Sequence, residues 1–161
     1  MPLSMPGRLS SISEARVQSV LSATLRVETP GIGFIEITAA ARDFVAQAGA
    51  SDGVFFAFLR HTSASLTIQE NADPDVQTDL TTALDRLAPE AAPGRKIWIH
   101  DSEGSDDMPA HVKAMLNGVS LHVPVKDGQL ALGTWQGLYL VEHRRAPHAR
   151  EVIFQFIGSR A

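Results

Sequence analysis

The chain has 161 residues, a length that fits one domain and is short for two. Apolar residues make up 44% and charged residues 20%, so the composition is that of a globular protein and excludes wholesale disorder. The net charge of −4 disfavours generic binding to nucleic acid or anionic membranes, and the absence of cysteine excludes disulfides and thiolate chemistry. No apolar run approaches the ~18 residues of a membrane span, and no signal peptide is recognisable. We therefore expect a cytoplasmic protein whose partners include neither nucleic acid nor membrane.

The sequence predicts a Ser- and Pro-rich leader over residues 1–16, followed by a single domain over residues 17–161. The domain begins with two segments of period-two alternation, a helical segment capped by Thr38 and a continuous apolar run. We expect the apolar run to be a central strand that is covered on both faces. These four elements are Val20–Val27, Phe34–Ile37, Ala39–Ala48 and Val54–Leu59.

The middle of the chain predicts two helices. Asp73 is expected at the N-cap of the first, and Pro74 at its first helical position, where the missing N–H costs nothing. This helix ends before Pro89, and its apolar stripe consists of Val76, Leu80, Leu84 and Leu87. The elements expected next are a strand over Ile97–His100, an acidic loop over Asp101–Asp107 and a helix over Pro109–Gly118.

The last third of the chain has β character throughout and is expected to form an antiparallel meander, with a turn at Asp127 and Gly128. Mixed helices and strands followed by an all-β tail predict an α+β fold, in which a single compact domain holds a mostly antiparallel sheet and a few helices. The strands expected in the tail are Leu121–Val125, Leu130–Thr134, Leu138–His143 and Val152–Ile157.

Histidine is the most informative residue type, because it titrates near neutral pH and is the commonest metal ligand. His100 ends an expected strand and His111 lies on the first turns of a helix, so the two flank the acidic loop and can converge on a metal ion. Asp107 is expected to cap that helix or to orient the imidazole of His111. His61 is the candidate for a third ligand, since three histidines with an open position form a catalytic zinc site. A capped surface residue is the alternative for His111.

Several polar and aromatic residues are candidates for substrate binding. In an extended segment, His61, Ser63 and Ser65 share one face, where they suit a phosphate or polar ligand; a solvated strand face is the alternative. Trp135 lies between glycines and can stack on a flat ring, or it can be a core residue at a bulge. Arg144 belongs to a cationic cluster that can bind phosphate, or that can simply be solvated.

Glu142 and His143 are the candidate catalytic residues. As neighbours in a strand they point to opposite faces, so their roles should differ. Glu142 shares its face with Leu138 and Leu140, which predicts a raised pKa suited to a general acid or base. The alternative is that a nearby arginine, such as Arg144, neutralises it. We expect His143 to matter less than Glu142.

Three segments together resemble a known family. His61–Leu80, His100–Leu121 and Gly133–Arg144 look like the signature blocks of the YjbQ family, also called secondary thiamine-phosphate synthase, and the similarity runs from about residue 24 to residue 158. The resemblance implies a compact α+β domain that assembles as a homotrimer with a histidine-lined, metal-binding pocket. The motifs carry over to the metal candidates His61, His100 and His111, and to Trp135, Gln136, Glu142 and His143.

The activity that the resemblance implies is the joining of hydroxymethylpyrimidine diphosphate to thiazole phosphate, which is regarded as a side activity. A metal ion, zinc above all, together with Lys113 and Arg144 would stabilise the diphosphate leaving group, and the acidic loop would suit magnesium. The sequence therefore supports a metal-dependent enzyme acting on a small phosphorylated or heterocyclic metabolite. The alternative is a non-catalytic module that binds a small ligand or a metal.

Overall fold

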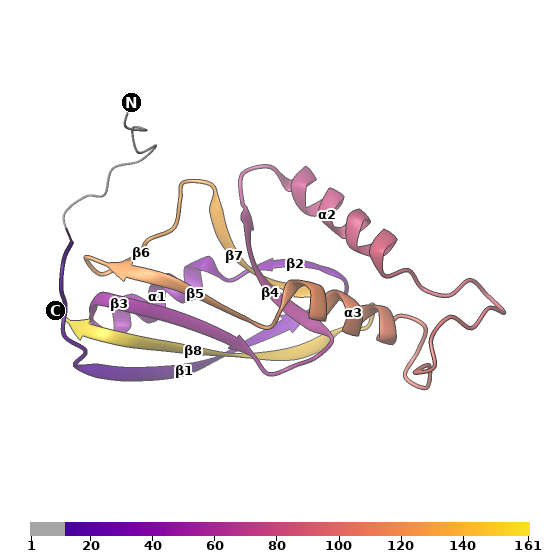
Figure 1. Cartoon of the computed structure of the whole chain (residues 1–161), viewed down its shortest axis with the longest axis horizontal. Coiled ribbons are helices and arrows are strands. Elements are labelled where there is room, and N and C mark those ends of the chain that lie inside the picture. Colours follow the sequence, from indigo (N-terminus) through magenta and orange to yellow (C-terminus); the bar gives the residue numbers. More distant parts are fainter. Residues whose placement is uncertain (1–11) are drawn as a thin grey trace, which may run out of the picture.

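The computed structural model describes residues 12–161 (Figure 1). The described chain folds into two antiparallel sheets with three helices, which confirms the α+β class. The elements are β1 (Ser19–Thr29), β2 (Gly33–Glu36), α1 (Thr38–Gln47), β3 (Ala50–Leu59), β4 (Ala64–Glu70), α2 (Pro74–Leu87), α3 (Asp107–Asn117), β5 (Ser120–Lys126), β6 (Gln129–Leu130), β7 (Gln136–Glu142) and β8 (His148–Arg160).

The strands are divided between two sheets, and this arrangement differs from the expected meander. The five-stranded sheet has the order β1-β8-β3-β5-β6, and the three-stranded sheet has the order β2-β7-β4. Of the expected meander, only β5 and β6 pair with each other; β7 belongs to the other sheet, and β8 lies between β1 and β3. The predicted meander is wrong because β8 pairs with β1, a long strand far away in the sequence. The pairing runs from Thr29 opposite His148 to Ser19 opposite Gly158.

The hydrophobic core lies between the sheets and α1. The rings of Phe44, Phe55 and Phe154 meet there, with centroids 5.0–6.0 Å apart. β3 is central in its sheet, as expected, but only one of its faces is covered: Phe56 and Phe58 point outward and are 37% and 49% exposed. The expectation of burial on both faces is thus wrong for a single chain, because an antiparallel sheet packs on one side only.

The two predicted helix caps differ in outcome. Asp73 caps α2 as predicted, since its carboxylate accepts the backbone N–H of Asp75 at 2.9 Å. Thr38 does not cap α1: it is the first helical residue, and its hydroxyl donates to Glu36 Oε1 at 2.7 Å and accepts the N–H of Leu138 at 2.9 Å. The hydroxyl of Thr38 therefore ties the helix start to β2 and β7.

Between α2 and α3 the chain forms a long loop without a strand. The expected strand over Ile97–His100 is wrong, and Ile99 is almost fully exposed. A β-prone run forms a strand only where another strand can pair with it, and here the Trp98 indole N–H instead donates to the carbonyl of Pro89 at 3.3 Å. For the same reason the expected strand over Leu130–Thr134 is reduced to the two residues of β6. α3 begins at Asp107, two residues before the expected Pro109.

Residues 12–18 precede β1 without forming a helix or strand, and the rest of the expected leader lies outside the described residues. Among residues 12–161, no helix combines the length and the apolar composition needed to cross a membrane. The cytoplasmic location stays a prediction.

Candidate metal centre

Three side chains that can hold a metal ion lie together at the start of α3. Asp107 is its first residue and His111 follows one turn later, so both project from the same face. The preceding loop brings His100 to them. Asp107 Oδ2 lies 2.9 Å from His100 Nε2 and 3.4 Å from His111 Nε2. One ligand atom from each of the three residues lies within 4.8 Å of the other two, so small side-chain rotations bring all three to one ion.

The second ring nitrogen of His111 determines which form of the imidazole is present. Nδ1 lies 2.9 Å from the carbonyl oxygen of Thr62, which can only accept, so Nδ1 must carry a proton. In the neutral ring, Nε2 then has a free lone pair that faces the carboxylate of Asp107. Two acceptors in this position repel each other unless a proton or a metal ion lies between them. A backbone carbonyl bound to the second nitrogen is the arrangement that metal-binding histidines use.

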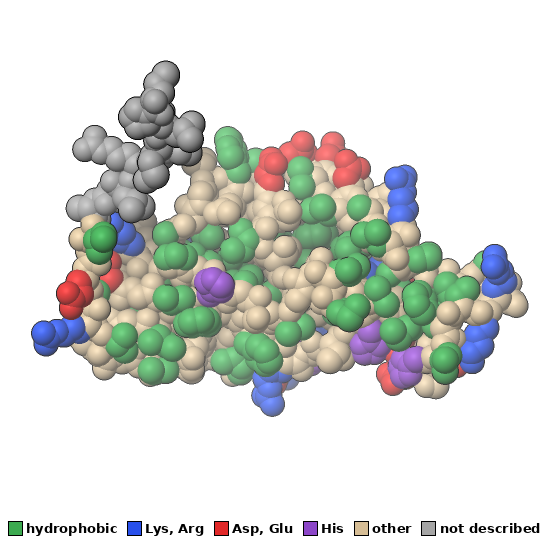
Figure 2. Space-filling model, in the orientation of Figure 1, with side chains coloured by type: hydrophobic (Ala, Val, Ile, Leu, Met, Phe, Trp, Pro, Cys, Tyr) green, Lys and Arg blue, Asp and Glu red, His purple; other side chains and the backbone are tan. Residues whose placement is uncertain are grey.

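The three side chains of the site differ in their exposure to solvent. The side chain of Asp107 is 2% exposed, whereas those of His111 and His100 are 31% and 45% exposed. The carboxylate therefore lies at the bottom, and the two imidazoles line the entrance from solvent. Figure 2 shows histidine side chains gathered at the end of the molecule where α3 and the long loop lie in Figure 1.

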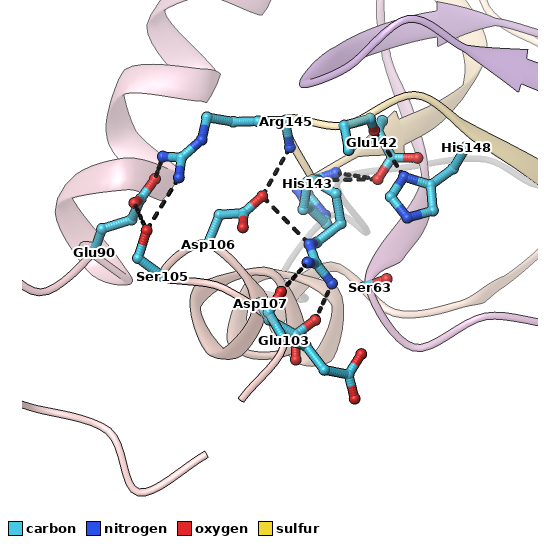
Figure 3. Close-up of polar contacts among 12 residues, drawn as sticks. Ser63, Glu90, Glu103, Ser105, Asp106, Asp107, Glu142, His143, Arg145 and His148 are labelled. Atoms are coloured by element: carbon cyan, nitrogen blue, oxygen red, sulfur yellow. Dashed lines mark hydrogen bonds and ion pairs between the residues drawn. The ribbon is translucent and has the colours of Figure 1, made fainter. Parts of the chain in front are cut away.

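The guanidinium of Arg144, a predicted substrate-binding group, binds the acidic loop and the start of α3. Its guanidinium donates from Nη1 to Asp107 Oδ1, from Nε to Asp106 Oδ2 at 3.3 Å and from Nη2 to the carbonyl of Glu103 at 2.7 Å. Figure 3 shows these contacts around Asp106, Asp107 and Glu103. The arginine thus binds the back of the carboxylate whose front faces the histidines.

Other charges in and beside the acidic loop are also paired. Arg145 binds Glu90 and Ser105 with its guanidinium, and Asp101 lies 2.7 Å from Lys96. Three of the four carboxylates that the loop offers to magnesium, those of Asp101, Asp106 and Asp107, therefore have cationic partners already.

His61 does not join the two other histidines. Its Nε2 accepts the backbone N–H of Glu151 at 3.0 Å, and burial together with the charge of Arg150 lowers its pKa. The third group near His100 and His111 is the carboxylate of Asp107 instead. His61 still lies next to the site in sequence, because the following residue, Thr62, supplies the carbonyl that holds His111.

Ser65, Lys113 and His143 form a buried polar network on the inner side of α3. Ser65 Oγ lies 2.9 Å from His143 Nε2 and accepts from Asn117 Nδ2 at 3.1 Å. Burial and the nearby charge of Lys113 lower the pKa of His143 to about 4. Lys113 lies 2.5 Å from Asp85. Ser65, Lys113 and His143 are buried, whereas their partners Asn117 and Asp85 are exposed, so these contacts fix the inner side of α3 from its solvent-facing edge inward.

Glu142 is fully buried and held by an arginine other than Arg144. Arg150 binds both its oxygens, at 2.6 and 2.7 Å, and Thr29 donates to Oε2 at 2.9 Å. Burial alone would raise the pKa of Glu142, but these hydrogen bonds outweigh it and the pKa is lowered. The expected raised pKa is therefore wrong. Arg150 also donates to Ser63 Oγ at 3.1 Å, so Ser63 faces this ion pair.

Trp135 and Gln136 lie at the opposite end of β7 from the histidines. Trp135 is 64% exposed, and Gln136 Oε1 accepts the N–H of Gly133 at 2.8 Å. The seven residues of β7 span about 20 Å, a length that separates these two residues from Arg144 and the site behind it. Within one chain, a small ligand cannot contact both groups.

The comparisons with known proteins agree on one family. The family model described as "UPF0047 protein YjbQ-like" matches residues 23–159. A UPF0047 protein of a Synechocystis strain is 47% identical over 134 residues, which cover 83% of this chain and 89% of that protein. The chain belongs to the YjbQ family.

Solved structures, one of them described as a member of the YjbQ/UPF0047 family, have the same fold. One from Clostridium acetobutylicum, described as an uncharacterised conserved protein, is 36% identical, has a TM-score of 0.69 and covers 85% of this chain and 98% of that chain. A conserved hypothetical protein from Thermus thermophilus is 37% identical, also with a TM-score of 0.69, and covers 81% and 97% of the two chains. The YjbQ fold therefore accounts for the described domain.

Two hollows flank the candidate metal centre of this YjbQ domain. One, of about 340 Å³, is mainly apolar and is lined by Thr62, His111, Ala114, Met115, Gly118 and Val119. The other, of about 270 Å³, borders His100 and is formed by the long loop, including Gly94, Arg95, Lys96, Trp98 and Ser105. Sequence reasoning missed the cationic residues of the second hollow, because no pattern places a long loop.

Sequence reasoning also gave Asp107 too small a role. Its spacing of four residues from His111 was recognised, but the carboxylate was assigned to helix capping or to orienting the ring. A carboxylate four residues before a histidine, at a helix start, is also the spacing of two ligands on one helix face. That spacing is the signal by which Asp107 could have been found.

Proposed function

We propose that this YjbQ-family chain is a metal-dependent enzyme that holds zinc through His100, Asp107 and His111. The observation that carries the proposal is the lone pair of His111 Nε2, which is fixed by Thr62 and faces the carboxylate of Asp107. Two imidazoles and a carboxylate suit zinc and leave a fourth position open. When bound, zinc supplies a Lewis acid for a substrate oxygen or a water that ionises near neutral pH.

The two hollows support a substrate with two unlike ends. Arg95 and Lys96 border the hollow beside His100, where they can bind an anionic group such as a phosphate. The hollow beside His111 offers apolar surface from Ala114, Met115 and Val119, which suits a flat ring. A small phosphorylated heterocyclic metabolite that spans the metal centre would match both hollows.

Within this class, the thiamine-phosphate synthase reaction is the specific activity that we propose. Hydroxymethylpyrimidine diphosphate would lose its diphosphate as thiazole phosphate attacks, giving thiamine phosphate. The cationic loop would bind the diphosphate that departs. We expect slow turnover, because neither hollow offers a buried hydrogen-bonding group that specifies a pyrimidine.

One observation favours the second candidate, a binding module without turnover. The two predicted acid–base residues are both sequestered: Glu142 binds Arg150, and His143 binds Ser65. Neither opens into the hollows beside the metal centre. The enzyme reading therefore relies on a metal-activated group or on a base from the substrate.

The test compares zinc-loaded wild type, His111→Ala and the control His148→Ala in the thiamine-phosphate reaction, with a metabolite extract as a second substrate source. His148 is a suitable control because, among the described residues, its ring bonds only to the carbonyl of Ala146 in the loop before β8. We expect slow product formation by wild type and control and none by His111→Ala. Zinc-dependent retention of a metabolite without turnover would favour the binding module.

We also propose that the chain assembles as a homotrimer. The outer face of the five-stranded sheet carries Phe56, Phe58 and Ile153 around a shallow cavity of about 390 Å³. Figure 2 shows hydrophobic side chains spread over the surface where β3, β5 and β8 lie. Apolar surface of this kind marks a protein–protein contact. A second copy is the occupant we propose, in line with the assembly that the family resemblance implies.

A further inference from the structure

Arg144 hydrogen-bonds to one of the two carboxylate oxygens of Asp107. Its Nη1 donates to Oδ1, while Oδ2 faces His100 and His111. The other guanidinium nitrogens are also engaged, by Asp106 Oδ2 and by the carbonyl of Glu103. The side chain of Arg144 is 13% exposed, so solvent offers little competition for these bonds.

The backbone of Arg144 is fixed from the other side. Its N–H donates to Glu142 Oε1 at 3.0 Å, and Glu142 is itself held by the buried guanidinium of Arg150. A continuous set of contacts therefore runs from the interior ion pair, through Arg144, to the carboxylate at the floor of the metal centre. Nothing in this set depends on a ligand being present.

We propose that Arg144 is a positioning residue that makes Asp107 a one-oxygen ligand and thereby keeps a coordination position open. The inference rests on the proposed metal site. A carboxylate with both oxygens free can bind an ion through both, which would fill the position that a substrate or water needs. With Oδ1 bonded to Arg144, only Oδ2 remains for the ion.

Arginine suits this role better than lysine. Its planar fork serves the carboxylates of Asp106 and Asp107 and the carbonyl of Glu103 at once, from three different nitrogens. A lysine could replace the bond to Asp107 Oδ1 but not the whole set. We therefore expect Arg144→Lys to preserve the positive charge and the bond to Asp107 Oδ1, with fewer hydrogen bonds to hold the loop.

The test uses cobalt(II) in place of zinc, because its visible absorption is strong in four-coordinate sites and weak in sites with more ligands. Wild type, Arg144→Gln, Arg144→Lys and the control Arg145→Gln are titrated with cobalt and then with azide. Arg145 is a matched control, because it binds Glu90 and Ser105 in the same loop but does not touch Asp107 with its side chain.

We expect a strong spectrum that responds to azide in wild type, in Arg145→Gln and in Arg144→Lys. Arg144→Gln should give a weaker spectrum and lose the azide response, with cobalt still bound. If Arg144 acted only through its charge, Arg144→Gln would bind cobalt more tightly with an unchanged spectrum, and the proposal would be overturned.

A measurement on wild type covers the case in which Arg144→Gln does not fold. A crystal structure of the zinc-loaded protein should show Oδ2 of Asp107 alone on the ion and Oδ1 on Arg144. Asp107 bound through both oxygens would refute the inference while leaving the metal site intact. Wild type that binds neither cobalt nor zinc would refute the proposed function itself.

Discussion

Glu142 and Arg150 form an ion pair inside the protein, and each depends on the other. Glu142→Gln would leave the guanidinium of Arg150 buried without a counter-charge, so we expect the free energy of unfolding to fall by about 3–5 kcal/mol. Urea denaturation measures this loss. The double variant Glu142→Leu with Arg150→Met should recover much of the loss, because no buried charge remains. Loss of turnover with less than about 1 kcal/mol of destabilisation would instead mark Glu142 as a catalytic base.

His143 predicts a pH dependence of stability. Its pKa falls from the ordinary 6.5 to about 4 in the folded chain, so the unfolded chain takes up a proton first as the pH drops. The contribution is fully present above pH 6.5 and is lost as the pH falls toward 4. At pH 5 the loss amounts to about 2 kcal/mol. Urea denaturation at pH 7.5 and pH 5 should show a smaller pH effect in His143→Gln than in wild type, and equal effects would contradict this assignment.

At the level of single residues, the sequence predicted that two of the three groups in the candidate metal centre, His100 and His111, lie close together. His100 and His111 flank one loop, and a loop can bring its two ends together. The sequence could not show that His61 Nε2 accepts a hydrogen bond from the backbone of Glu151, or that Arg150 rather than Arg144 neutralises Glu142. These partners come from strands far apart in the chain, and residue type alone does not reveal which strands lie side by side.

The N-cap of α2 should make a measurable contribution to the free energy of unfolding. Asp73 accepts the N–H of Asp75 at the start of α2, a helix with no fully buried residue. Asp73→Ala should therefore lower the free energy of unfolding by about 1 kcal/mol. Denaturant unfolding monitored by circular dichroism gives the value, with Asp79→Ala in the same helix as the control. A loss no larger than that of the control would mean that α2 frays without affecting the fold.

Elements with internal signals were predicted well, and elements that depend on partners were not. Pro74 and the spacing of Val76, Leu80 and Leu84 define α2 without reference to the rest of the chain. Ile97–His100 has the same β-prone composition as a strand, yet it is part of a loop because no strand lies beside it. Sheet membership of β7 and β8 likewise depends on long-range pairing, which local alternation does not encode.

For the whole molecule, the outer face of the large sheet predicts the assembly. Phe58 is 49% exposed on that face in a single chain. Light scattering of wild type should give three times the 17.3 kDa of the chain, and Phe58→Glu should give a monomer with unchanged circular dichroism. Leu87→Glu, an exposed leucine at the end of α2, is the control and should stay trimeric. A wild-type monomer at micromolar concentration would contradict the proposal.

The central claim is that His100, Asp107 and His111 hold one metal ion. The most direct measurement is the zinc content of the protein after chelation, reloading and desalting, by mass spectrometry of the element. Wild type and His148→Ala should each retain about one zinc per chain, and His111→Ala and Asp107→Asn should retain less than about a tenth of that. Wild type without zinc, or equal zinc in all four proteins, would contradict the claim.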